Sequence, residues 1–259
     1  MAYGNFDFFS DCLKRTVSFR IVLPNENLKN EEKLNVLYLL HGYNGISSDW
    51  MLNSSILEIA SQKQICIVLP TGENSFYLNQ AATGREYASF VGKELPDYIC
   101  QTFPVTASRE GTFIGGFSMG GFGALHTALA FPERFGKALA LSSALIVNEV
   151  KQMKPGYGNE IANYEYYKMT FGEPAMLDNS VNNPEYLVKE LINSKQTIPD
   201  IYMACGTEDF LLQPNREFAD FLKRNKVRFT YKEGPGNHNF DFWSNYLIDA
   251  VSWIFEERE

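Results

Sequence analysis

The residue of this chain that is most clearly suited to catalysis is a serine with a glycine two positions before it and another two positions after it. Residues 112–125 read TFIGGFSMGGFGAL, so Ser118 stands between a short apolar β-type run and a helical run of small residues. A side chain at Gly116 or Gly120 would crowd a tight turn from strand to helix. A serine held out on such a turn can attack a carbonyl carbon when a neighbouring base takes its proton.

The base must come from only three histidines. His238 lies in a glycine-rich loop, EGPGNH at residues 233–238, between a predicted strand at 227–231 and the last helix. Such a loop hangs over the carboxyl edge of a sheet, so His238 is predicted to be the general base. His126 falls inside the helix after the serine and is predicted to be a hydrogen-bonded structural residue. His41 ends an early strand and is predicted to brace a loop that supplies an oxyanion-hole amide.

The base needs a carboxylate that orients its ring, and the order along the chain should be serine, acid, histidine. The sequence Gly-Thr-Glu-Asp-Phe follows the apolar run 201–205 and offers two candidates, of which Asp209 is favoured over Glu208 because Asp is the commoner orienting residue. Two backbone N–H groups should stabilise the oxyanion. Tyr43 and Met119 occupy the expected places.

These residues must be positioned by strands that end at one edge of a sheet. Five near-continuous apolar runs are typical of strands covered on both faces, as in a parallel sheet; they lie at 36–40, 65–69, 112–114, 138–141 and 201–205. Helical patterns separate several of them, at 54–62, 88–100, 121–130, 215–225 and 240–256. Residues 15–23 alternate in polarity, which predicts an antiparallel strand paired with residues 6–9. The pattern predicts an α/β fold with a mostly parallel central sheet flanked by helices.

Residues 146–197 break this alternation and are rich in Gly, Pro, Asn and Tyr. A structureless loop of that length is improbable in a compact domain. The segment is therefore predicted to form short helices above the sheet, as a cap insertion in a single domain of residues 1–259. Its aromatic rings either line a pocket or form the core of the cap; Tyr164 and Tyr167, together with Trp50, are predicted to contact the substrate.

The composition excludes several other classes of protein. The 31 acidic and 23 basic residues give a net charge of −8 without a basic cluster, which is unsuited to nucleic acid or an anionic membrane. Four scattered cysteines and three separated histidines predict neither disulfides nor a metal site, and Cys66 and Cys205 read as small buried side chains. The N-terminus lacks the features of a signal peptide, and no apolar stretch reaches the roughly 18 residues of a membrane span. A cytoplasmic protein is expected, and homo-oligomerisation is left open.

Four motifs in order make the chain resemble the esterase D/putative esterase family of α/β-hydrolases: LLHG at 39–42, GFSMGG at 116–121, GTED at 206–209 and GPGNH at 234–238. The likeness covers nearly the whole chain, including residues 6–24 and Trp50, and is greatest for the tributyrin-esterase-like, acetylesterase branch. It implies the α/β-hydrolase fold and a cofactor-free serine carboxylesterase for short acyl esters, related to feruloyl and acetylxylan esterases. By motif, Ser118, Asp209 and His238 would be the catalytic residues, with Tyr43 and Met119 as oxyanion donors.

Other functions stay open at this stage. A thioesterase or acyltransferase would use the same three residues, because only the nucleophile that resolves the acyl-enzyme differs. Relatives that hydrolyse S-formylglutathione usually have a Ser-Gly-Leu-Thr-Cys type loop where this chain has residues 41–43, His-Gly-Tyr, which argues against that thioester. A non-catalytic binding module would be expected to lack a catalytic residue, and none is lacking. The partner is predicted to be a small-molecule ester whose identity the sequence does not specify.

Overall fold

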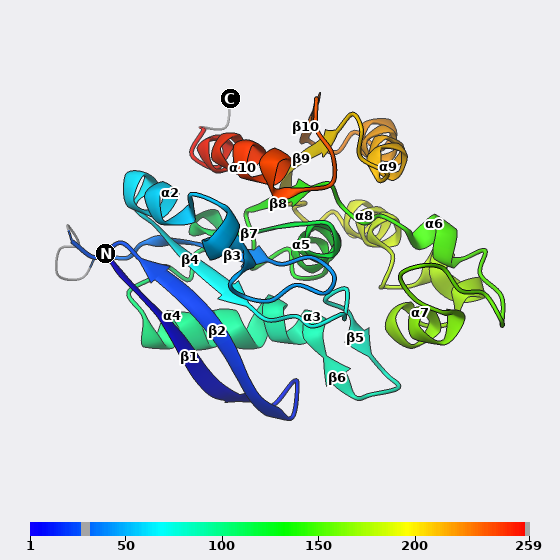
Figure 1. The fold of residues 1–259 in the computed structure, drawn as a ribbon, viewed down its shortest axis with the longest axis horizontal. Coiled ribbons are helices and arrows are strands. Elements are labelled where there is room, and N and C mark those ends of the chain that lie inside the picture. The colour runs from blue at the N-terminus through cyan, green and yellow to red at the C-terminus, as the bar shows by residue number, and fades with distance from the viewer. Residues whose placement is uncertain (27–31, 257–259) are drawn as a thin grey trace.

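The computed structural model describes residues 1–26 and 32–256, and an eight-stranded sheet runs through its centre (Figure 1). The strand order is β1-β2-β4-β3-β7-β8-β9-β10. At one edge, β1 (Ala2–Ser10) and β2 (Arg15–Leu23) form an antiparallel hairpin, and β2 is antiparallel to β4 (Ile65–Pro70). The remaining neighbours are parallel: β3 (Asn35–Leu40), β7 (Thr112–Phe117), β8 (Lys137–Leu141), β9 (Asp200–Gly206) and β10 (Phe229–Gly234).

Helices cover both faces of this sheet. One face carries α1 (Asp49–Asn53), α2 (Ile56–Lys63) and α10 (Phe240–Ile254). The other carries α3 (Tyr87–Ser89), which continues through a π-helical turn (Phe90–Glu94) into α4 (Leu95–Thr102), and also α5 (Met119–Ala130) and α9 (Leu212–Arg224). In β3, Val36 and Tyr38 belong to the core on one face, whereas Leu37 and Leu39 belong to the core on the other. This double coverage explains the continuous apolar runs.

The predicted α/β fold is confirmed, with shifts at the ends of elements. The helix after the serine begins at Met119 rather than at residue 121, and β7 continues to Phe117 rather than ending at residue 114. Gly115 lies inside the strand, where the neighbouring strand approaches closely. A Cβ at this position would come 3.0 Å from the Cβ of Leu139, so the packing favours glycine here. A glycine pair that reads as a turn is therefore strand, because tertiary packing overrides its low strand propensity. Cys66 and Cys205 are buried inside β4 and β9, as predicted.

The segment 146–197 forms short helices, as predicted: α6 (Val147–Val150), α7 (Tyr164–Phe171), a 3-10 turn (Pro174–Asn179) and α8 (Pro184–Asn193). They do not all lie above the sheet. Leu187 and Val188 of α8 pack with Leu125 of α5 and Phe218 of α9, so α8 is part of a helix layer on one face of the sheet. The helices α6 and α7 lie together at one end of the molecule (Figure 1). That residues 146–197 act as one cap stays a prediction. A short ribbon of β5 (Asn79–Gln80) and β6 (Arg85–Glu86) lies beside α7.

The histidine in α5 has the structural role predicted for it. His126 is buried, and its Nε2–H donates to the carbonyl oxygen of Val181 at 3.0 Å. Its ring stacks on Phe122, with the two planes inclined by 11°. Burial, opposed only in part by the hydrogen bond to Val181, lowers the pKa of His126 to about 4. The imidazole is therefore neutral in the folded protein over the physiological range.

We expect the free energy of unfolding to fall as the pH drops from about 6.5 towards 4, with His126 contributing up to about 3 kcal/mol. In the unfolded chain His126 has an ordinary pKa and takes up a proton in this range, whereas the folded protein keeps it neutral, so acid favours unfolding. Urea denaturation across this range would measure the effect, and His126→Gln should lose most of the slope between pH 6.5 and about 5. Nearer pH 4, carboxylates whose pKa is held low, such as Asp209 and Glu233, add a slope that both proteins share. Burial also lowers the pKa of His41, so a smaller slope due to His41 should remain in both proteins. Equal slopes would contradict the assignment.

Candidate active site

Ser118 sits at the carboxyl end of β7 in a backbone conformation that side chains rarely adopt, with φ 54° and ψ −121°. The turn is fixed by the Ser118 N–H, which donates to Leu141 O at 2.9 Å, and by the Ala144 N–H, which donates to Ser118 O at 3.0 Å. A Cβ at Gly116 would lie 2.5 Å from the carbonyl oxygen of Gly120, and a Cβ at Gly120 would lie 2.5 Å from a carbonyl oxygen of β3. Only glycine fits at either place, so the strained turn presents a half-buried serine hydroxyl at the edge of the sheet.

The three predicted catalytic side chains lie in contact. His238 follows β10, and its Nε2 lies 2.9 Å from Ser118 Oγ. Its Nδ1 lies 2.9 Å from Asp209 Oδ2 and 3.1 Å from Asp209 Oδ1. With a carboxylate at Nδ1, that nitrogen carries the proton and donates it, which leaves Nε2 free to accept the hydroxyl proton of Ser118. The three residues come from loops after β7, β9 and β10, which end at the same edge of the sheet.

Asp209 is a buried anion, with 0% of its side chain exposed. Burial alone would raise its pKa, but hydrogen bonds from His238 and from the Leu211 N–H, the latter at 2.8 Å, outweigh burial and hold the Asp209 pKa below its usual value. Its neighbour Glu208 is exposed and points elsewhere, accepting hydrogen bonds from the Gly236 N–H at 2.5 Å and from the hydroxyl of Thr207 at 2.8 Å. Glu208 thus fastens the loop that carries His238, whereas Asp209 contacts the imidazole itself.

Two aromatic rings enclose the His238 imidazole. Trp243 of α10 meets it edge-on at 4.9 Å between ring centroids, and Phe210 lies against it at 4.6 Å. Trp243 is buried and stacks on Phe117 at 4.1 Å, so the core of the sheet supports the imidazole from one side. Phe210 is 68% exposed, which makes it a ring that a bound molecule beside His238 could touch.

The loop after β3 holds Tyr43, the first predicted oxyanion donor. The Gly72 N–H donates to His41 Nε2 at 2.8 Å, so the proton of that imidazole lies on Nδ1 and is donated to Gly42 O at 2.7 Å. The Gly45 N–H donates to the same carbonyl at 3.1 Å. Because a trans peptide is planar with its N–H opposite its C=O, these bonds fix the direction of the Tyr43 N–H. His41 therefore braces this loop, and burial lowers its pKa and keeps it neutral.

Met119, the second predicted donor, is the first residue of α5. The first N–H groups of a helix have no carbonyl partner within it and carry the positive end of the helix dipole. The Met119 amide directly follows Ser118 and is therefore suited to stabilise negative charge that forms beside the serine.

A cleft of about 490 Å³ has Phe210 in its lining, the residue whose ring contacts the His238 imidazole; Ser118 and His238 themselves are not among its lining residues. The lining includes Tyr167 and Ile161 of the cap segment and Phe210 and Leu211, which follow β9. The remaining lining residues are mainly amide and carboxylate side chains with a few apolar ones: Leu145, Ile146, Asn148, Glu149, Gln152, Asn159, Gln213, Pro214 and Glu217. Of the three predicted substrate-binding residues, only Tyr167 lies in this lining.

The other two residues predicted to contact the substrate, Trp50 and Tyr164, are packed inside the protein. Trp50 is 1% exposed, donates from its indole to Leu40 O at 3.0 Å and packs edge-on against Phe117, so it is a core residue under the oxyanion loop. Tyr164 is buried within the cap, with its hydroxyl 3.4 Å from Glu173. Neither residue lines the cleft, and their contact with a substrate stays a prediction.

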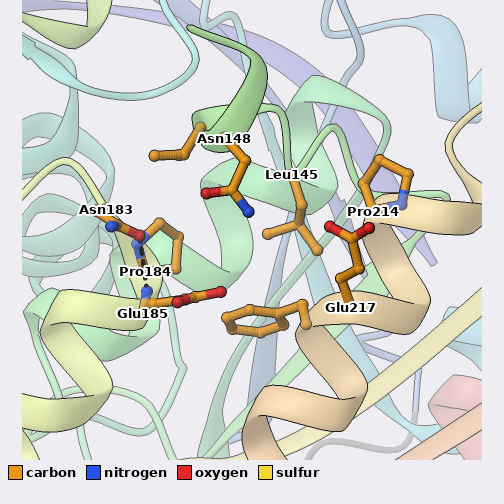
Figure 2. Close-up of a pocket in the computed structure, with 9 residues that line it drawn as sticks. Leu145, Asn148, Asn183, Pro184, Glu185, Pro214 and Glu217 are labelled. Atoms are coloured by element: carbon orange, nitrogen blue, oxygen red, sulfur yellow. Dashed lines mark hydrogen bonds between the residues drawn. The ribbon is translucent and has the colours of Figure 1, made fainter. Parts of the chain in front are cut away.

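A second, smaller hollow lies between α6, α8 and α9, with Asn148, Glu185 and Glu217 around it (Figure 2). Its volume of about 20 Å³ has room for about one water molecule. Burial raises the pKa of Glu185. The hollow is too small for a substrate.

Neither a metal cluster nor a membrane helix is found in the part of the chain that the structure describes. Within residues 1–26 and 32–256, no group of three or more His, Cys, Asp or Glu side chains is arranged to hold a metal ion. No helix of these ranges combines the length and the apolar character that a membrane span requires.

Fold and site together define the class of this protein: a serine hydrolase with the α/β-hydrolase fold. The family model described as "Putative esterase" matches residues 10–254, so the chain belongs to that family of carboxylic-ester hydrolases. An acetyl esterase of Caldicellulosiruptor saccharolyticus is 39% identical over 261 residues, which cover 98% of each chain. The family membership confirms the predicted resemblance and sets aside the binding-module alternative.

Two solved structures from Staphylococcus aureus are also similar. FphF, a fluorophosphonate-binding serine hydrolase in a substrate-bound form, gives a TM-score of 0.88 at 27% identity and covers 99% of both chains. The S-formylglutathione hydrolase FrmB gives a TM-score of 0.85 at 27% identity, covering 98% of this chain and 99% of that one. The likeness therefore extends over the whole fold and does not by itself choose between oxygen esters and thioesters.

Sequence reasoning missed several residues around the site. Phe210, beside Asp209, reads as an ordinary loop residue, although an exposed ring next to a candidate acid was a usable signal. Asn44 has a positive φ of 58° and hydrogen-bonds to Asn74, a residue 30 positions away that no local pattern connects to it. The cleft residues Ile161 and Glu149 lie in the cap, where no periodicity indicates which side chains face a pocket.

Proposed function

We propose that this protein is a serine carboxylesterase that hydrolyses short-chain acyl esters through an acyl-serine intermediate. The observation that carries the proposal is the continuous hydrogen-bonded chain from Ser118 Oγ through His238 to the buried Asp209 carboxylate, with 2.9 Å at each link. A general base within this distance of a serine hydroxyl is the arrangement that nucleophilic catalysis requires. The acetyl esterase relative supports a short acyl group. The substrate would be a small-molecule ester, and a cytoplasmic location stays an expectation.

In the first half of the reaction, Ser118 Oγ attacks the ester carbonyl carbon while its proton passes to His238 Nε2. The carbonyl oxygen becomes an oxyanion and accepts hydrogen bonds from the N–H groups of Tyr43 and Met119. Asp209 stabilises the imidazolium that forms. The tetrahedral intermediate then expels the alcohol oxygen, which takes the proton from His238 Nε2, and the acyl group stays on Ser118.

In the second half, a water molecule replaces the alcohol. His238 Nε2 takes a proton from this water as its oxygen attacks the acyl carbon, and the same two N–H groups hold the second oxyanion. Collapse of this intermediate breaks the bond to Ser118 Oγ, which regains the proton from His238. The carboxylic acid leaves and the serine hydroxyl is restored.

A fluorophosphonate probe followed by peptide mass analysis tests the nucleophile. The probe forms a phosphonyl ester that hydrolyses slowly, so we expect a stable adduct on the peptide that contains Ser118. Brief mixing with p-nitrophenyl acetate before the probe should slow labelling, because both reagents compete for the same hydroxyl. An adduct on a different serine, or hydrolysis that continues in fully labelled protein, would overturn the proposal.

Thioester hydrolysis is a second candidate, favoured by the likeness to the S-formylglutathione hydrolase FrmB. The leaving group must lie near His238 Nε2, which donates its proton to it, and the 490 Å³ cleft is the one whose lining residue Phe210 contacts that imidazole. This cleft carries the carboxylates of Glu149 and Glu217. Glutathione carries two carboxylates and one ammonium, and the two glutamates would repel a leaving group with this net negative charge. The cleft therefore favours a neutral leaving group.

We expect the enzyme to prefer a neutral over an anionic leaving group of matched size. Methyl 4-acetoxybenzoate and 4-acetoxybenzoate form such a pair. Each kcat/KM value is divided by the rate constant of the same ester with hydroxide, which removes the difference in their intrinsic reactivity. Each carboxylate near 4 Å contributes roughly 1 kcal/mol in a solvated site, so Glu149→Gln or Glu217→Gln should each narrow the preference about fivefold. Added salt should narrow it too. A preference that both substitutions leave unchanged would contradict this assignment of the cleft.

A further inference from the structure

The loop that carries Tyr43 is tied to a second loop by a pair of asparagine side chains. Asn74 lies between β4 and β5, and its Oδ1 accepts the backbone N–H of Asn44 at 2.7 Å. Its Nδ2 donates to Asn44 Oδ1, also at 2.7 Å. One side-chain amide therefore contacts both the backbone and the side chain of the residue after Tyr43. Asn44 has a φ of 58°, a conformation that asparagine tolerates better than most residues.

The same asparagine is held from its other side by the cap. The hydroxyl of Tyr166 in α7 donates to the backbone carbonyl oxygen of Asn74 at 2.8 Å. The Tyr166 ring also meets the Tyr43 ring edge-on, with 5.8 Å between centroids. Burial, as the largest cause, raises the pKa of Tyr166, so its hydroxyl keeps the proton that it donates. A continuous set of contacts therefore leads from α7 through Asn74 to the loop of Tyr43.

These contacts complete the restraint on one backbone amide. The Tyr43 N–H lies in the plane of the Gly42–Tyr43 peptide, and the place of that peptide in the loop also depends on the backbone that follows the Tyr43 Cα. The plane before Tyr43 is fixed by the hydrogen bonds that Gly42 O accepts from His41 and Gly45. The plane after it contains the Asn44 N–H, and the bond to Asn74 fixes that one. Without Asn74, the backbone at Asn44 could shift and take the Tyr43 Cα, together with the peptide before it, out of position.

We propose that Asn74 is a positioning residue of the oxyanion hole, which sets the Tyr43 N–H through Asn44 and couples it to α7 through Tyr166. This inference rests on the proposed function, because Tyr43 is an oxyanion donor only in that mechanism. Loss of a whole oxyanion donor costs about 10² to 10³ in kcat in other enzymes. A donor that is present but loosely positioned should cost less, about tenfold.

The variants separate the position of the Tyr43 amide from the stability of the loop. Asn74→Ala removes both bonds to Asn44 and should lower kcat by about tenfold with little change in KM. Asn74→Asp still accepts the Asn44 N–H, and the Asn44 amide can turn to donate to the second carboxylate oxygen, so its kcat should stay within about threefold of wild type. Tyr166→Phe keeps the ring but removes the hydrogen bond to the backbone carbonyl of Asn74, and its kcat should fall between those of Asn74→Ala and wild type. Asn53→Ala, which removes an exposed hydrogen bond to Asp49 O in α1, is the matched control.

The decisive readout is the affinity for an alkyl trifluoromethyl ketone, which a serine converts to a hemiketal whose oxyanion needs the same donors. In Asn74→Ala its inhibition constant should rise in step with the fall in kcat/KM, and Asn74→Asp should restore both. The inference is overturned if Asn74→Ala keeps wild-type kcat, or if its activity falls while the ketone binds as before. Should Asn74→Ala fail to fold, wild-type ketone affinity in Tyr166→Phe would overturn it. Failure of the wild-type protein to form a hemiketal at Ser118 would instead overturn the proposed function.

Discussion

Ser118→Ala is expected to lower kcat for p-nitrophenyl acetate by about 10⁶, the cost of removing the nucleophile in enzymes of this kind. The substitution deletes the oxygen that His238 Nε2 contacts at 2.9 Å and leaves the chain without an atom to carry the acyl group. The fold should persist, because alanine needs no more space than serine and the turn keeps the two backbone hydrogen bonds of residue 118. Steady-state kinetics with a thermal melt of each protein measure both effects.

Ser61→Ala is a suitable control for that experiment, since Ser61 is an exposed residue of α2 and is not part of the site. It should retain wild-type kcat. If Ser118→Ala kept more than about a tenth of the activity, Ser118 could not be a covalent nucleophile, because no loss so small follows removal of the attacking atom.

The sequence predicted those parts of the molecule that depend on local pattern or on a strict chemical requirement. Continuous apolar runs located the parallel strands, because a strand covered on both faces has no polar side. The turn at Ser118 was readable because only glycine fits at positions 116 and 120, where a Cβ would approach a carbonyl oxygen to 2.5 Å. Ser118, Asp209 and His238 could be singled out because each follows a strand of the same sheet, so their loops meet at one edge.

The sequence could not predict features that depend on contacts between distant segments. Trp50 resembled a pocket residue by type and position, yet its indole N–H finds a partner in Leu40 O within the core. The helix α8 lies within the predicted cap segment but packs with α5 and α9, which no local periodicity reveals. The contact of Asn44 with Asn74 spans 30 positions and uses two polar residues that read as ordinary loop. In each case tertiary packing, rather than local propensity, determines the role of the residue.

Asp209→Asn is expected to lower kcat by about 10⁴, whereas Glu208→Gln should change it only a few-fold. An Asn amide at position 209 would donate an N–H to His238 Nδ1, which places the ring proton on Nε2. In that tautomer Nε2 can no longer accept the hydroxyl proton of Ser118. Glu208→Gln retains a carbonyl oxygen that accepts the Gly236 N–H, so the loop of His238 stays fastened. The two side chains are adjacent in sequence and lose the same charge, so the comparison isolates contact with the imidazole.

The difference between the two variants should lie in kcat rather than KM, because the orientation and charge of the imidazole matter most in the transition state. Asp209 is suited to this role because its side chain is wholly buried and its pKa is held low, so it remains a carboxylate opposite the imidazolium. Glu208 lacks that environment, since it is exposed and its hydrogen bonds go to Thr207 and Gly236. If Glu208→Gln were the more damaging substitution, then fastening of the His238 loop, rather than direct contact with the ring, would control the base, and Asp209 would not be the orienting residue.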